Sequence, residues 1–243
     1  MAKDRDLDLF LAGATVAKEV FELRNDYRTL LIAVDGIQPG IGGEVSEKLL
    51  VAAESKGRDL TFERPVEEIP HVVKWREAYM AFGAKPSRTR NSLEALIRRS
   101  TKGLPRINPL TNLYNAISIL HQIPIGGEDI NQYSGPPKLV RADGQELFST
   151  VEEGKEVTDH PDPGEVIWRD DVGVTCRRWN WRQTARTQLT NTSTAALFIF
   201  DALESIGDEA LQTAADDLVS KVISFGNNVK TSQRLITAKD ENI

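Results

Sequence analysis

The 243-residue chain has few cysteines, histidines and methionines, with one, three and two of them respectively. The single cysteine, Cys176, excludes an internal disulfide and any metal site built from several thiolates, which fits a reducing compartment and predicts a cytoplasmic protein. His71, His121 and His160 lie in unrelated contexts without the spacing of metal ligands. The carboxylates form no recognisable metal-binding loop either, so we expect neither a metal nor another cofactor.

Long apolar runs are also missing. The short apolar patch at residues 9–12 follows a charged N-terminus and is too brief for the core of a signal peptide or for a membrane span. We therefore expect no contact with a membrane. The chain is nevertheless long enough to bury a substantial core without a disulfide or a cofactor.

The excess of positive charge is confined to one segment, because the chain as a whole carries a formal net charge of −6. Residues 74–106 contain nine basic residues and two acidic ones, a balance of +7, so the rest of the chain carries −13. This distribution is compatible with an acidic body that docks a polyanion through one basic face. A charged run of this kind can also be a solvated helix surface.

Residues 177–187 combine two tryptophans and four arginines in eleven positions. Arginine forks grip phosphates and carboxylates, and indole faces stack on bases or on flat cations, so this segment indicates a nucleic acid or a charged planar ligand. A strand over 172–182 would place two sets of side chains on opposite faces, namely Arg178, Asn180 and Arg182 against Arg177, Trp179 and Trp181. In that arrangement the indoles can also be ordinary core residues.

The spacing of apolar residues and turn signals gives a coarse map of the chain. It predicts helices over 44–56, 71–82, 93–99, 110–122 and 208–225, and strands over 16–23, 29–34, 138–142, 146–149, 166–168, 172–182 and 195–200. Gly57 is the predicted stop of the first helix, and Ser92 the predicted cap of the third. Helices gathered in the middle and strands gathered after them favour an α+β fold, a single domain of mixed or antiparallel sheet packed with helices.

The spacing within residues 108–129 resembles the editing-domain motif of the phenylalanyl-tRNA synthetase β subunit. The matching positions are Asn108, Pro109, Asn115, Pro124 and Asp129. Together with the run 178–183, they make the chain similar to the free-standing members of that family. The resemblance covers residues 15–226, which leaves 1–14 as an N-terminal extension and 227–243 as a C-terminal tail. It implies the fold of that editing domain and the hydrolysis, in trans, of the ester joining a wrong amino acid to the 3′ end of a tRNA.

The chain departs from the family pattern at the position where the synthetase domain has a histidine. Gly126 stands there, followed by Gly127 and Glu128 in place of Ala and Phe. A carboxylate near indoles favours a cationic or guanidinium-like amino acid. Some free-standing family members act on tRNA for arginine charged with canavanine, the oxygen-containing arginine analogue, which is therefore the leading substrate. Another near-cognate amino acid, such as tyrosine on tRNA for phenylalanine, is the other possibility.

The resemblance and the residue types together define three groups of candidate site residues. The candidates for activating water are Glu128, Asp129 and the vicinal hydroxyl of the terminal ribose. The candidates for oxyanion donors are the backbone N–H groups of Gly126 and Gly127. The pocket candidates are Asn112, Tyr114, Asn115, Trp179, Asn180 and Asp201, the last as the nearest counterpart of a family acid. The candidates for the tRNA phosphates are Arg88, Arg90, Arg98, Arg99, Arg182 and Arg186.

The expected partner is a mischarged tRNA, with no role for DNA, and we expect a monomer. Two other function classes fit the same residues. One is a non-catalytic tRNA- or RNA-binding module that uses the basic face and the indoles but hydrolyses nothing. The other is a small-molecule amidohydrolase or amino-acid-binding protein, for which RNA affinity would not depend on salt.

Overall fold

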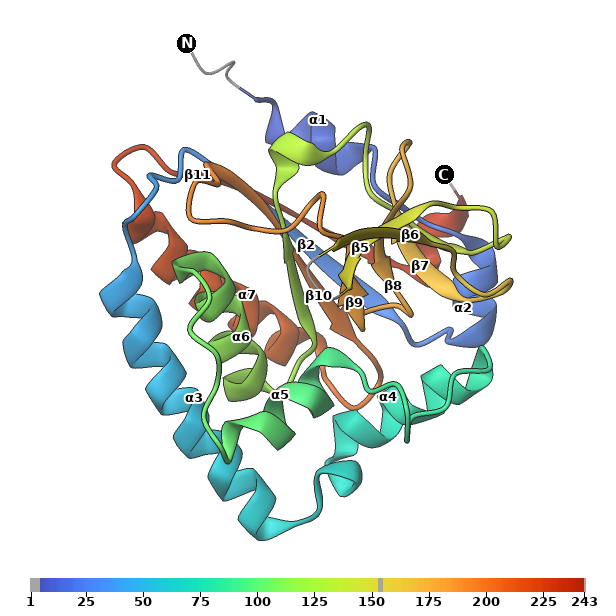
Figure 1. Cartoon of the computed structure of the whole chain (residues 1–243), viewed down its shortest axis with the longest axis horizontal. Helices are drawn as coiled ribbons and strands as arrows, with labels where there is room; N and C mark the ends of the chain where they lie inside the picture. The colour runs from blue at the N-terminus through green and yellow to red at the C-terminus, as the bar shows by residue number, and fades with distance from the viewer. Residues whose placement is uncertain (1–4, 153–154, 243) are drawn as a thin grey trace.

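Strand β2 (Arg28–Asp35) runs through a four-stranded antiparallel sheet in the computed structural model, which describes residues 5–152 and 155–242 (Figure 1). The strand order is β11-β2-β10-β3, with β10 at Ala195–Ala202, β3 at Ile125–Glu128 and β11 at Lys230–Thr237. All eight residues of β10 are buried. A strand covered on both faces reads as a continuous apolar run rather than as an alternating one, as 195–200 does.

One face of this sheet packs against α6 (Pro109–His121) and α7 (Asp208–Val222). Ile32 and Phe198 meet Leu113 and Leu218 there in one apolar core. Helices α3 (Gly43–Glu63) and α5 (Ser92–Ser100) pack outside α6, and Figure 1 shows these helices gathered on one side of the molecule.

Capping residues define the start of α6. Asn108 accepts a hydrogen bond from the Thr111 amide at 2.8 Å, and Pro109 occupies the first turn, where its missing N–H costs nothing. The helix ends at Gln122, which takes a left-handed φ of 56°. The helix predicted over 110–122 is thereby confirmed. Asn91 rather than Ser92 caps α5, because its side chain accepts from the Glu94 amide.

Helix α3 continues past its predicted stop at Gly57. A Cβ on this residue would lie 2.0 Å from the Ser100 hydroxyl on α5, so the glycine permits two helices to approach closely. Its role is therefore in helix packing, and the helix ends only at Glu63.

The other face of the sheet meets a second, mixed sheet of order β1-β4-β7-β8-β9, in which only β1 and β4 pair in parallel. Its strands are β1 (Thr15–Val16), β4 (Lys138–Arg141), β7 (Val166–Arg169), β8 (Val174–Arg177) and β9 (Arg182–Gln183), with a separate hairpin of β5 (Phe148–Glu152) and β6 (Lys155–Asp159). Trp75 of α4 (Pro70–Ala81) and Trp168 lie in the core between the two sheets. Short 3-10 turns cover Val66–Glu68, Ile130–Gln132, Ile223–Phe225 and Ala238–Asn242.

The predicted strand over 16–23 is wrong, since only Thr15–Val16 is extended and Lys18–Leu23 forms helix α2. The folded unit also reaches beyond 15–226 at both ends. Strand β11 pairs with β2 along eight residues, and Arg234 donates to the carbonyls of three residues at the end of the first helix, α1 (Leu7–Ala12), and just after it. Both ends therefore contribute to the central sheet and its cover.

The α+β class predicted from the sequence is confirmed, with antiparallel and mixed sheets packed against helices. Of the helices within residues 5–152 and 155–242, none combines the length and the apolar composition needed to cross a bilayer.

Candidate active site

A four-residue turn interrupts the segment that we expected to form one strand. Strand β8 ends at Arg177 and β9 begins at Arg182, so the strand predicted over 172–182 is wrong. Between them, Arg178 and Trp179 both have positive φ angles, of 47° and 66°. This left-handed region is rarely occupied by bulky residues, and such backbone persists only where its surroundings hold it.

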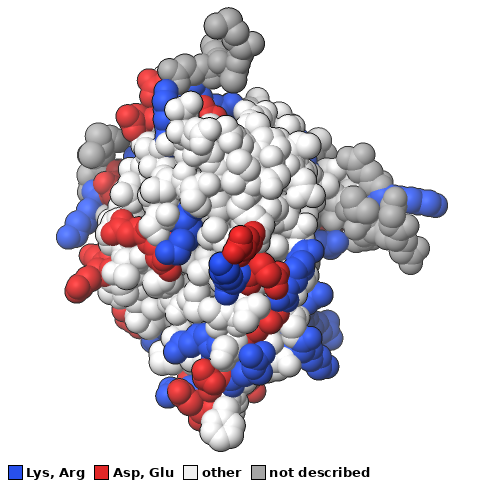
Figure 2. All heavy atoms as spheres, turned by 90° about the vertical axis from the view of Figure 1, so that its left-hand side faces the viewer, with Lys and Arg blue, Asp and Glu red and all other residues white. Residues whose placement is uncertain are grey.

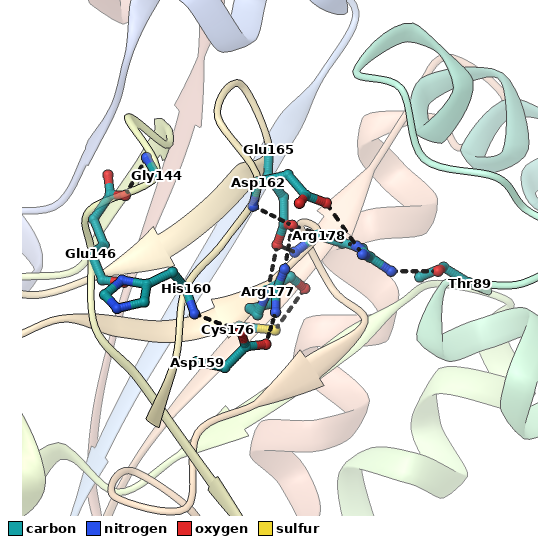
Figure 3. A network of polar contacts seen from close by, with 10 residues as sticks. All are labelled: Thr89, Gly144, Glu146, Asp159, His160, Asp162, Glu165, Cys176, Arg177 and Arg178. Carbon is teal, nitrogen blue, oxygen red and sulfur yellow. Dashed lines mark hydrogen bonds and ion pairs between the residues drawn. The ribbon is translucent and has the colours of Figure 1, made fainter. Parts of the chain in front are cut away.

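Glu165, in the loop just before β7, holds the turn (Figure 3). Its carboxylate accepts from Arg177 Nε and Nη2 at 2.9 and 2.8 Å, and from the Arg178 amide at 3.0 Å. Arg177 also reaches Asp159 at the end of β6, while Arg178 donates to Thr89. Arg177 is buried and paired, so it is a structural residue.

The turn directs Trp179 and Asn180 into the interior. The Trp179 ring lies 4.9 Å from the Tyr27 ring and is fully buried. Asn180 accepts from the Tyr79 hydroxyl at 2.9 Å and donates to Asp201 at 3.1 Å. Tyr27 donates to the other Asp201 oxygen at 2.7 Å, so the carboxyl group is fixed from two sides.

Trp179, Asn180 and Asp201 border a cavity of about 230 Å³ between α5, α6 and the strands β3 and β7–β10. Its lining includes seven predicted site residues, namely Tyr114, Asn115, Gly126, Glu128, Trp179, Asn180 and Asp201. Sequence reasoning did not place the other nine, Ser92, Ala95, Leu96, Ile125, Trp168, Cys176, Trp181, Gln183 and Ile199, at the site.

Strand register places the two carboxylates on one face of the central sheet. Glu128 lies opposite Leu197, and the Asp201 amide donates to the carbonyl of Pro124. The two positions are thus four residues apart along the strands, roughly 13 Å. Gly126 lies between them, and a Cβ there would already touch Gln183 Nε2 at 3.4 Å, so the missing side chain keeps the space open.

Glu128 is fully buried, and burial raises the pKa of its carboxyl from the ordinary value of 4.5 to about 7. The Tyr133 hydroxyl donates to Oε2 and partly offsets that effect. The hydroxyls of Thr175 and Thr187 also lie near the carboxyl, but among the described residues none makes a hydrogen bond of normal geometry with Oε1. Oε1 is therefore a buried acceptor without a partner of normal geometry.

Asp201, at the other end of the cavity, is also a buried acid with a raised pKa. Burial raises the pKa of its carboxyl to about 7, and its hydrogen-bond partners Tyr27 and Asn180 are uncharged. Cys176 also lines the cavity, and burial and then the charges of Glu128 and Asp201 raise the pKa of its thiol. The cavity therefore favours a positively charged occupant, which would stabilise both ionised carboxylates.

Comparison with known families matches residues 74–237 to the B3/4 domain. The chain belongs to the B3/4 domain family. Among solved structures, an N-terminal fragment of the phenylalanyl-tRNA synthetase β subunit from Pyrococcus horikoshii matches 89% of this chain at 11% identity, with a TM-score of 0.45. The chain spans about half of that structure, since 49% of it is covered. A search of curated proteins finds no match.

The matched segment contains every residue that lines the cavity. Three of the predicted catalytic and pocket residues also lie in this segment but do not line the cavity. Asp129 accepts from the Ser193 hydroxyl and from the Asn131 amide, so its carboxyl caps a turn. Asn112 accepts from the Ile107 amide. At Gly127 a Cβ would collide with the Tyr114 ring, which explains the glycine by packing.

Several arginines of the basic segment of this B3/4 domain pair with acids, most of which come from other elements. Arg98 pairs with Glu67 and Glu94, and Arg106 with Glu47 and Glu54. Basic and acidic side chains are correspondingly interleaved on the face that carries α3 (Figure 2). A single basic face, as the sequence suggested, is therefore not present there.

The predicted phosphate contacts divide into paired and unpaired arginines. Arg186 donates to both oxygens of buried Asp170, and Arg90 lies 3.5 Å from Glu94. Within residues 5–152 and 155–242, the side chains of the three others make no ion pair, and these are Arg88, Arg99 and Arg182. These three predicted phosphate contacts remain available to an anionic partner.

The histidines lie away from the cavity. His71 accepts from the Trp75 indole and the Leu203 amide, and burial lowers its pKa to about 4, so it is a neutral core residue. His121 contacts Asp217, and His160 contacts a backbone carbonyl. In the described part of the chain, no three His, Cys, Asp or Glu residues are grouped to hold a metal.

Proposed function

We propose that the chain is a trans-editing aminoacyl-tRNA deacylase, which hydrolyses the ester between a wrong amino acid and the 3′ end of a tRNA. The observation that carries the proposal is the cavity, which is lined by Glu128 and Asp201 from the same face of the central sheet and by tryptophan side chains. At about 230 Å³ it is smaller than typical small-molecule sites of about 300 Å³ and more. It therefore suits one amino-acid side chain, with the nucleotide outside.

The amino acid proposed for this cavity carries a cation at its end. Asp201 is held in place by Tyr27 and Asn180, and the Trp179 ring lies beside it. A fixed carboxylate next to an aromatic ring binds a guanidinium by charge and by cation–π attraction. Canavanine on tRNA for arginine is the substrate that fits this chemistry best, as the family resemblance also implies.

Glu128 is the proposed general base. Its free oxygen takes a proton from water, the water oxygen attacks the carbonyl carbon, and the bond from that carbon to the ribose oxygen breaks. The ribose oxygen takes up a proton as it leaves, so the products are a free amino acid and an intact tRNA. Asp129 is a poor candidate for this role because both its oxygens already accept hydrogen bonds. Of the two predicted oxyanion donors, the Gly126 N–H faces Ile199 within the sheet and Gly127 lies outside the cavity lining, so neither is assigned this role.

The test is a deacylation assay with the purified protein on canavanyl-tRNA for arginine, tyrosyl-tRNA for phenylalanine and the two correctly charged tRNAs. We expect selective release of canavanine. Release of tyrosine alone would support the proposed deacylase activity and contradict the proposal that the substrate amino acid is cationic. No release from any of them, together with salt-sensitive tRNA binding, would favour the non-catalytic RNA-binding module.

A further inference from the structure

The indole N–H of Trp168 is a buried donor without an acceptor. The side chain is 1% exposed and lines the cavity, and none of the described residues accepts a hydrogen bond from Nε1. Buried donors are nearly always paired, so an unpaired one that borders a cavity points to an acceptor supplied by an occupant.

Trp168 lies between the two ends of the cavity. It pairs across β7 and β8 with Cys176, which pairs in turn with Gln183, and Gln183 Nε2 donates to the carbonyl of Gly127, which lies between the two acids along the sheet. An amino acid with its ester at Glu128 and its cation at Asp201 would therefore pass Trp168 with the middle of its side chain.

A second indole in the wall is less suited to this role. Nε1 of Trp179 also makes no hydrogen bond of normal geometry, but it lies near the Tyr27 hydroxyl, whose pKa it lowers. Nε1 of Trp168 has neither a hydrogen-bond partner nor such a contact in the described part of the chain, so of these two indoles it is the donor left for an occupant.

We propose that the indole N–H of Trp168 donates a hydrogen bond to an oxygen atom in the substrate's side chain and thereby distinguishes an oxyguanidine amino acid from arginine. This inference rests on the proposed function. The two amino acids differ where canavanine has an oxygen and arginine a methylene group. The oxygen accepts the indole N–H, whereas the methylene leaves the donor buried and unpaired. Sites that pair with a substrate polar group reject analogues that lack it.

The test is the replacement Trp168→Phe, which keeps an aromatic ring and removes the N–H. We expect release of canavanine to slow, release of arginine from its cognate tRNA to rise, and the ratio of the two kcat/KM values to fall about tenfold. Trp75→Phe is the matched control, because its buried indole already donates to His71 outside the cavity. The control should keep the selectivity of the unaltered protein.

A second measurement uses the unaltered protein. The chain has four tryptophans, so its labelled indole N–H groups give four NMR signals. Canavanine methyl ester should shift the Trp168 signal downfield, and arginine methyl ester should not. Equal shifts with both esters, or unchanged selectivity in Trp168→Phe, would overturn the inference and leave the deacylase intact. Release of neither amino acid by the unaltered protein would overturn the proposed function and the inference with it.

Discussion

Glu128 and Asp129 are adjacent in the sequence, but their carboxyl groups have different surroundings. Glu128 ends β3 and points into the cavity with one oxygen unbonded. Asp129 begins the next turn and has both oxygens bonded to Ser193 and Asn131. Only the first has the freedom that a general base needs.

Replacing Glu128 by Gln is expected to lower kcat on canavanyl-tRNA by about 10²–10⁴. A base must be ionised, and burial raises the pKa of this carboxyl to about 7, so the rate of the unaltered protein should rise from pH 6 to pH 8 and then level off. Deacylation rates across this range check both statements. A flat profile would exclude Glu128 as the base. Glu44→Gln, at an exposed position on α3, serves as the control for loss of one charge.

The sequence predicted Glu128, Asp201, Trp179 and Asn180 as site residues because carboxylates, amides and indoles carry recognisable chemistry. It could not predict Trp168. That residue sits in a short apolar run typical of any buried strand, and its place at the cavity depends on the pairing of β7 with β8.

The turn at residues 178–181 is the element on which the site depends, and its shape comes from a residue outside it. Glu165 lies thirteen residues before Arg178 and binds its amide. The alternation of side chains along 172–182 does not reveal this contact with Glu165. A prediction from that alternation alone therefore gives one uninterrupted strand. Helices α4 and α6 were predicted well because their apolar spacing is local to the sequence.

Replacing Glu165 by Gln should weaken this turn. Arg177 would lose its buried carboxylate partner and keep only the exposed Asp159, at a cost of about 3 kcal/mol in the free energy of unfolding. We also expect KM for the aminoacyl-tRNA to rise, because Trp179 and Asn180 lose their fixed positions. Urea unfolding and steady-state kinetics measure the two effects.

The matched control for this prediction is Asp162→Asn. Asp162 lies 3.5 Å from the same Arg178 but is exposed, so its loss should cost less than about 1 kcal/mol. Equal effects of the two replacements would mean that Glu165 does not hold the turn.

At the scale of the whole molecule, two sheets enclose the cavity and leave both acids without a cationic hydrogen-bond partner. The net charge of −6 conceals a basic segment whose arginines mostly pair with acids from other elements. The sequence could predict the segment but not the pairing, since Arg106 meets Glu47 only after α3 has packed beside it.

Removing the unpaired charges Arg88 and Arg99 together should weaken tRNA binding several-fold and reduce its salt dependence. Arg106→Gln is the control, because this side chain is already held by Glu47 and Glu54. Filter binding at several salt concentrations gives both quantities. Equal salt slopes for the double variant and the unaltered protein would place the tRNA on another surface.

Stability should fall as pH rises. Glu128 and Asp201 keep their protons up to about pH 7 when folded, against ordinary pKa values of 4.5 and 3.8. Between the ordinary pKa and the folded-state pKa of each group, unfolding releases a proton. Each group therefore lowers the free energy of unfolding by about 3 kcal/mol or more by pH 8. Urea unfolding of the unaltered protein and of Asp201→Asn at pH 5 and pH 8 tests this. The same pH dependence in both proteins would contradict it.

The most direct test of the account compares the unaltered protein with Glu128→Gln in two assays on the same canavanyl-tRNA, ester hydrolysis and tRNA affinity. We predict rapid release by the unaltered protein, loss of release in the variant and equal affinity in both. Equal release rates, or no release by either protein, would contradict the claim that this cavity hydrolyses the ester.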